Sequence, residues 1–77
     1  ISKIEMTNIA KSTLDYIKES VRNKNISGNY NDTETINDYE IRKIVEEDEY
    51  YYKCYKIVIE VKKKEQIRRL ESYVLQQ

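Results

Sequence analysis

The chain has no histidine, proline, phenylalanine or tryptophan, and its 77 residues include a single glycine and a single cysteine. Without histidine, the most common general base and the most common zinc ligand are both missing. Glycine-rich phosphate loops need several glycines, and Gly28 stands alone. These absences argue against most hydrolases, zinc enzymes and nucleotide-binding enzymes. We therefore predict a non-catalytic protein, with no catalytic residue, no cofactor and no metal ligand.

The single cysteine, Cys54, cannot form an internal disulfide, so the redox compartment stays undecided. Cys54 lies inside a tyrosine-rich apolar run. We interpret it as a small buried hydrophobic residue rather than as a reactive thiol.

The length of the chain limits it to one small domain. A chain of 77 residues forms one domain, close to the size at which a hydrophobic core only just offsets the entropy of ordering the chain. It has neither a signal-like stretch nor a long apolar run and opens with Ile1, so we expect an excised domain whose anchor lies elsewhere.

The 14 basic and 14 acidic residues cancel, but they are unevenly placed. Residues 1–24 carry five bases and three acids, residues 25–50 two and eight, and residues 51–77 seven and three. The balance argues against a strong non-specific nucleic-acid binder, although a local basic patch remains open.

The first predicted element is an amphipathic helix over about residues 2–24. Apolar residues at steps of three and four form one stripe, and Ser2 with Glu5 has the spacing of a capping box. The stripe consists of Met6, Ala10, Leu14, Ile17 and Val21. Three isoleucines fall off the stripe, namely Ile1, Ile4 and Ile9; they either contact something outside this chain or are ordinary exposed residues.

The remaining chain predicts a polar loop over residues 25–35 and strands over about 37–46, 50–62 and 66–76, with the acidic stretch 46–49 as a hairpin connection. The strand at 50–62 is expected to be central, because it is rich in Tyr, Ile and Val. The fold class is then α+β, with one long N-terminal helix packed on a three-stranded antiparallel meander. Residues 66–76 also have helical spacing, which leaves an α-β-β-α arrangement open.

Two clusters are candidate binding sites. The acidic stretch 46–49 matches no calcium-loop spacing, so a solvated turn explains it better than a metal site. Tyr50, Tyr51, Tyr52 and Tyr55, interleaved with lysines, suggest a stacking platform for single-stranded nucleic acid. We favour a tyrosine-rich strand instead, because no glycine-containing RNA-binding signature accompanies the tyrosines.

The order of these parts resembles the soluble head of a type IV pilin or of a type II secretion pseudopilin, and is most similar to small minor subunits of Gram-positive systems. The segment AKSTLDYIKESVRNKNIS resembles the exposed half of the pilin helix, and YYYKCYKIVIEVKKKEQIRRLESYVLQQ resembles the strands that close the head. The resemblance covers the whole chain, residues 1–77, by pattern only. Cys54 alone cannot supply the C-terminal disulfide of many Gram-negative pilins.

This resemblance implies a structural subunit of a pilus or pseudopilus at the cell surface, anchored in the membrane before assembly by an apolar helix upstream of this chain. Its partners would be other pilin subunits, contacted through the helix and through charged faces of the head, with no small-molecule substrate. Glu5 should not be mistaken for the glutamate near the start of the pilin apolar segment.

A second interpretation is a small cytosolic nucleic-acid-binding or regulatory module of α-β-β-α type. It requires residues 66–76 to be helical and its basic side chains to share one face. These are Lys62, Lys63, Lys64, Arg68 and Arg69. A third, an immunity or inhibitor protein that acts through its surface alone, has no sequence signature to test.

Overall fold

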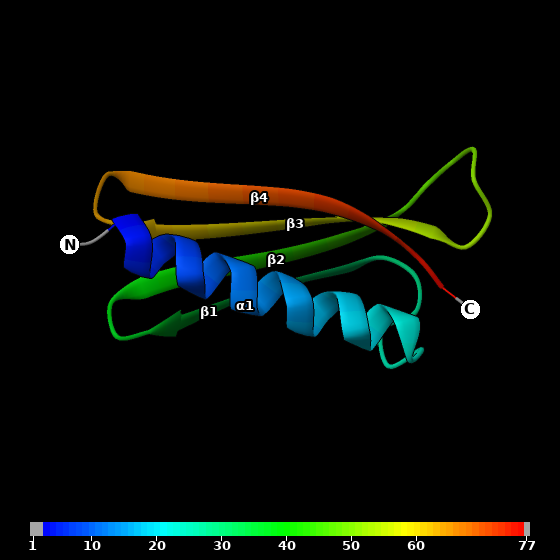
Figure 1. The fold of residues 1–77 in the computed structure, drawn as a ribbon, viewed down its shortest axis with the longest axis horizontal. Helices are drawn as coiled ribbons and strands as arrows, with labels where there is room; N and C mark the ends of the chain where they lie inside the picture. Colours follow the sequence, from blue (N-terminus) through cyan, green and yellow to red (C-terminus); the bar gives the residue numbers. More distant parts are fainter. Residues whose placement is uncertain (1–2, 77) are drawn as a thin grey trace.

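The computed structural model describes residues 3–76. The helix α1 (Lys3–Arg22) is followed by four strands, β1 (Tyr30–Ile36), β2 (Tyr39–Glu47), β3 (Cys54–Lys63) and β4 (Gln66–Leu75). All neighbouring strands are antiparallel and stand in the order β1-β2-β3-β4, so the sheet is a simple meander. The helix lies lengthwise on one face of this sheet (Figure 1), and the α+β class predicted from the sequence is confirmed.

The helix buries the predicted stripe. Met6, Ala10, Ile17 and Val21 are almost fully buried against the sheet, and Leu14 packs at the edge of the core. The helix was expected to extend to residue 24 but ends at Arg22. Ile1 and Ser2, and with Ser2 the capping box, lie outside the described residues.

A Schellman-type turn explains why the helix ends early. The backbone N–H of Asn25 donates to the carbonyl of Ser20 at 2.9 Å, and Lys24 adopts a left-handed backbone with φ 62°. The polar exit predicted after the helix therefore begins with a defined hydrogen-bonded cap.

The core lies between α1 and the inward face of the sheet. Along β3 every second side chain points towards the helix and is buried, from Tyr55 through Ile57 and Ile59 to Val61. Strand β2 adds Tyr39, Ile41 and Val45, and β4 adds Val74. The strand predicted to be central is flanked by β2 on one side and by β4 on the other.

The prediction of three strands was wrong, because the segment expected to be a loop over 25–35 contains most of strand β1. This strand is at the sheet edge, paired with β2 from Tyr30↔Val45 to Ile36↔Tyr39. This edge strand exposes all its side chains except Tyr30 and Glu34, which are half-buried, so the apolar alternation that signals a strand is missing. The chain reverses at Asn37 and Asp38, which both have positive φ (49° and 69°), as a type I′ hairpin turn requires.

Two strand boundaries also differ from the prediction. The acidic stretch 46–49 was expected to form the β2–β3 connection, yet β2 runs to Glu47. The next strand begins at Cys54 instead of residue 50, because the intervening segment folds back on Asp48. Residues 66–75 form strand β4, so the α-β-β-α alternative is wrong for this chain.

Candidate interaction surfaces

The connection between β2 and β3 carries three consecutive exposed tyrosines. We call residues 48–53 the tyrosine loop. Tyr50, Tyr51 and Tyr52 are 86%, 71% and 87% exposed, and the loop projects beyond the end of the sheet (Figure 1). The prediction that Tyr50, Tyr51, Tyr52 and Tyr55 belong to one strand, with some rings in the core, was wrong for the first three and right for Tyr55 on β3. Tyr55 alone of the four tyrosines considered is buried.

Hydrogen bonds fix the backbone of the tyrosine loop. One carboxylate oxygen of Asp48, Oδ2, accepts from the backbone N–H of Tyr50 at 2.9 Å and of Tyr51 at 2.7 Å. The N–H of Asp48 donates to the carbonyl of Cys54 at 2.8 Å, and the N–H of Cys54 donates to the carbonyl of Tyr51 at 3.2 Å. The acidic stretch therefore has a structural role through Asp48, which shapes the loop.

Two of the hollows beside the N-terminal half of α1 differ in charge. The larger, about 660 Å³, runs between α1 and strands β1 and β2. We call it the acidic groove, because its charged lining residues are Glu5 and Glu34. The smaller, about 290 Å³, lies between the start of α1 and β4. We call it the basic cleft, and its lining residues are Lys3, Ile4, Thr7, Asn8, Lys11 and Arg68.

The two described isoleucines that lie off the buried stripe, Ile4 and Ile9, differ in exposure. Ile4 is 73% exposed and lines both hollows. Ile9 is only partly exposed, because it packs against the edge of the core within the acidic groove. Packing within the chain therefore accounts for Ile9, whereas Ile4 presents most of its side chain at the surface.

Tyr39 links the acidic groove to the core. Burial raises the pKa of its phenol, and the hydrogen bond to Glu5 and the charge of that carboxylate raise it further. Beside it on the inward face, the Nζ atom of Lys43 lies 2.6 Å from Glu34 Oε1 and 3.8 Å from Asp32 Oδ2. Burial works against the charged lysine, but these carboxylates outweigh it, so the pKa of Lys43 is raised.

The face of the sheet that turns away from α1 carries a chain of ion pairs. Glu60 on β3 lies 3.8 Å from both Arg42 and Arg69, and Arg69 continues to Glu71 at 2.9 Å. Lys56 lies 3.3 Å from the same carboxylate. The hydrogen bond from Lys56 lowers the pKa of Glu71, partly offset by desolvation and reinforced by Arg69. Exposed pairs of this kind add little stability, and we interpret the face as a solvated surface.

The basic residues of the β3–β4 hairpin do not share a face. Arg69 joins the ion pairs of the outer face, whereas Arg68 lines the basic cleft on the helix side. Lys63 places its Nζ atom 4.8 Å from the centre of the Tyr39 ring. Because residues 66–75 are a strand and the cations are divided, no observation favours the nucleic-acid interpretation.

Cys54, a metal site and a membrane-spanning helix were the other features considered from the sequence. Cys54 is half-buried at the start of β3, where it contributes its backbone to the tyrosine loop. Within residues 3–76, no three Cys, Asp or Glu side chains stand close enough together to hold a metal ion. In that same range no helix combines the length and the apolar character needed to cross a bilayer.

Comparison with known protein families, with curated proteins and with solved structures finds no match to this chain. Its surfaces are therefore interpreted from their own chemistry. The sequence analysis missed the basic cleft, whose cations come from residues 3, 11 and 68. Lys3 and Lys11 lie on one side of α1, two helical steps of four residues apart, and the packing of α1 beside β4 adds Arg68 to them.

Proposed function

We propose that this chain is the head of a non-catalytic filament subunit, of the minor type IV pilin or type II secretion pseudopilin kind. It would assemble with other subunits through its N-terminal helix and through contacts between heads, at the cell surface. The apolar helix that anchors such a subunit before assembly would precede Ile1.

The observation that carries this proposal is the lengthwise packing of α1 on an antiparallel meander. The helix has 20 residues and lies against β3 and β4, which leaves its first turns at one end of an elongated body measuring 39 × 20 × 18 Å. A helix continued upstream from Lys3 would leave the head at that end. The exposed Ile4 would then lie where the helix meets neighbouring subunits, and its burial there would be favourable.

The first test is the sequence upstream of Ile1, read from the intact gene and from the N-terminus of the mature protein. The proposal expects a short basic leader that is cleaved, followed by about 20 apolar residues, enough to span a bilayer as a helix. A globular domain upstream, or a start codon directly before Ile1, would remove the proposal.

The second test asks where the intact protein resides. Cells are sheared mechanically, and an antibody against this head is used to follow the protein in the released filaments and in the cell lysate. The proposal expects the head in high-mass material released by shearing. Recovery only in the lysate, as a free chain, would contradict it.

A further inference from the structure

The tyrosine loop is larger than the fold requires. The other two hairpins of the same sheet turn within the two residues between their strands, at Asn37 and Asp38 and at Lys64 and Glu65. The β2–β3 connection instead uses the whole segment 48–53 and places three tyrosines in solvent. Large exposed aromatic side chains on one projecting segment are typical of docking surfaces, where tyrosine is enriched.

The loop is also prepared for docking. The hydrogen bonds that the Asp48 carboxylate accepts from Tyr50 and Tyr51, together with the backbone bonds of Cys54, hold the loop in one shape before any partner binds. Tyrosine has few side-chain torsions, so little conformational entropy is lost when its ring becomes fixed in an interface. A loop that served only to keep the hairpin soluble would need its carboxylates but not the three rings.

Charge restricts the partner of the tyrosine loop. The loop and the end of β2 carry Glu46, Glu47, Asp48 and Glu49, against the single cation Lys53. A surface that receives the rings must therefore be positively charged and must offer apolar area. The acidic groove fails this requirement, because its charged lining residues are the carboxylates Glu5 and Glu34, and the nearby cation Lys43 is already paired with Glu34.

The basic cleft meets both requirements. Its charged lining residues are Lys3, Lys11 and Arg68, and the exposed side chain of Ile4 supplies apolar surface. In the part of the chain that the structure describes, the ion pairs engage none of these three cations. Cations beside a tyrosine ring also bind its face directly, so the same groups can attract both the rings and the carboxylates of the loop.

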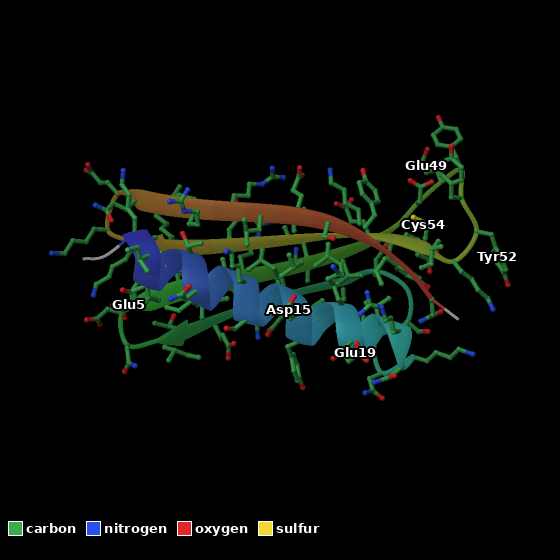
Figure 2. All side chains as sticks on the ribbon, in the orientation of Figure 1. Glu5, Asp15, Glu19, Glu49, Tyr52 and Cys54 are labelled. Atoms are coloured by element: carbon green, nitrogen blue, oxygen red, sulfur yellow. The ribbon has the colours of Figure 1, made fainter. Side chains whose placement is uncertain are left out.

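The loop and the cleft lie at opposite ends of the molecule. Strand β3 begins next to the loop at Cys54 and ends at Lys63, and Arg68 pairs with Val61 near that far end. Figure 2 shows Glu49 and Tyr52 at one end and Glu5, beside the cleft on the first turns of α1, at the other. One copy therefore cannot fill its own cleft, whereas two copies placed end to end can bring a loop to a cleft.

We infer that the tyrosine loop of one copy docks into the basic cleft of the next copy, so that heads join end to end along their long axis. Loop and cleft are different surfaces, and such a heterologous contact leaves one free loop and one free cleft at the ends of every assembly. The contact can then repeat without closing, as a filament requires. This inference rests on the proposed function and specifies which surfaces of the head would make the axial contact.

The test follows the mass of the 77-residue chain by sedimentation velocity from about 20 µM to about 1 mM, the range expected for a small interface. The weight-average mass should at least double, and about 0.5 M salt should reverse most of the increase by screening the charges. A chain that stays monomeric throughout this range would overturn the inference.

Two variants locate the contact. The loop variant carries Tyr50→Ser, Tyr51→Ser and Tyr52→Ser, and the cleft variant carries Lys3→Glu, Lys11→Glu and Arg68→Glu. Each should remain monomeric, and circular dichroism should show that each is folded. The matched controls are Tyr16→Ser, which removes a tyrosine 71% exposed on α1, and Lys18→Glu, which reverses a charge that belongs neither to the loop nor to the lining of the cleft; both should associate like the original chain.

Mixing the two variants gives the decisive result. The loop variant keeps an intact cleft and the cleft variant keeps an intact loop, so an equal mixture should form a one-to-one dimer and nothing larger. A mixture that stays monomeric, or a loop variant that associates as well as the original chain, would overturn the inference. Because these measurements use the head alone, their failure would leave the proposed membrane-anchored filament subunit to be judged by its upstream sequence.

Discussion

The side-chain amide of Gln76 donates a hydrogen bond to the backbone carbonyl of Val21, 55 residues earlier, at 3.0 Å. This carbonyl belongs to the last turn of α1 and also accepts from the backbone N–H of Lys24 at 3.1 Å, within the Schellman-type turn. The same amide lies 3.4 Å from the carbonyl of Ile26, and the backbone N–H of Gln76 donates to the carbonyl of Lys53 at 2.8 Å. The end of β4 thus holds the helix exit and the base of the tyrosine loop together.

The variant Gln76→Ala should lower the free energy of unfolding by about 1 kcal/mol, because it removes the side-chain hydrogen bonds that join the end of the chain to the helix exit at Val21 and Ile26. Urea unfolding followed by circular dichroism measures the change. The control is Gln66→Ala, at the exposed start of β4, which should change stability by less than about 0.5 kcal/mol. Equal effects at the two positions would show that the bond to Val21 has no special role.

The variant Asp38→Gly should stabilise the protein by about 0.5 to 1 kcal/mol. Asp38 has φ 69° at the second position of the β1–β2 turn, where glycine is favoured because it has no Cβ to clash. Thermal unfolding gives the change in midpoint. In the β3–β4 turn, Glu65 does not have a positive φ, so Glu65→Gly should destabilise the protein instead. A loss of stability in Asp38→Gly would contradict this account of the turn.

Because of Tyr39, the free energy of unfolding should fall as the pH rises into the alkaline range. Its pKa is raised above the ordinary value of 10.0 by burial and by Glu5, so the folded state favours the neutral phenol. The unfolded chain loses this proton first, so the stabilisation is complete below about pH 10 and is lost as the pH rises through the folded pKa. The free energy of unfolding, measured between about pH 9 and about pH 11, should fall less steeply in Tyr39→Phe than in the original chain.

The exposed Tyr16 provides the comparison for that experiment, since Tyr16→Phe should leave the steepness unchanged. Lys43, whose pKa is also raised, titrates in the same alkaline range and contributes equally to all three proteins. Only the difference between the original chain and Tyr39→Phe therefore reports on Tyr39. Identical slopes in these two proteins would contradict the prediction.

The variant Ile59→Ala should lower the free energy of unfolding by about 2 to 4 kcal/mol, because it leaves a cavity in the centre of the core. Ile59 is fully buried on the central strand β3 and faces α1. For a chain of this size such a loss is a large part of the total stability. Ile67→Ala, at an exposed position of β4, should cost less than about 1 kcal/mol, and an equal loss there would show that burial does not set the cost.

The periodic segments were predictable because burial imposes a pattern that the sequence records. The helix stripe from Met6 to Val21 and the alternation of β3 from Tyr55 to Val61 both appear in the residue order, and both are buried as expected. Strand β1 was missed because it lies at the sheet edge. Its order comes from backbone pairing with β2, which leaves no apolar pattern in its sequence.

At the tyrosine loop the sequence predicted a strand where the structure has none. Tyrosine favours strands, so local preference extended β3 back to residue 50. The carboxylate of Asp48 instead accepts two backbone N–H groups and turns the segment out of the sheet. Propensity is weak compared with a pair of hydrogen bonds to a charged acceptor.

By itself, the sequence determined the fold class, the helix and its buried face, the central strand and the absence of histidine chemistry, because composition and period act within one element. Tertiary structure decided the fourth strand, the exposure of three tyrosines and the basic cleft that unites positions 3, 11 and 68. These features depend on which elements lie side by side. That arrangement is fixed by packing across the whole chain, which no local pattern of residues contains.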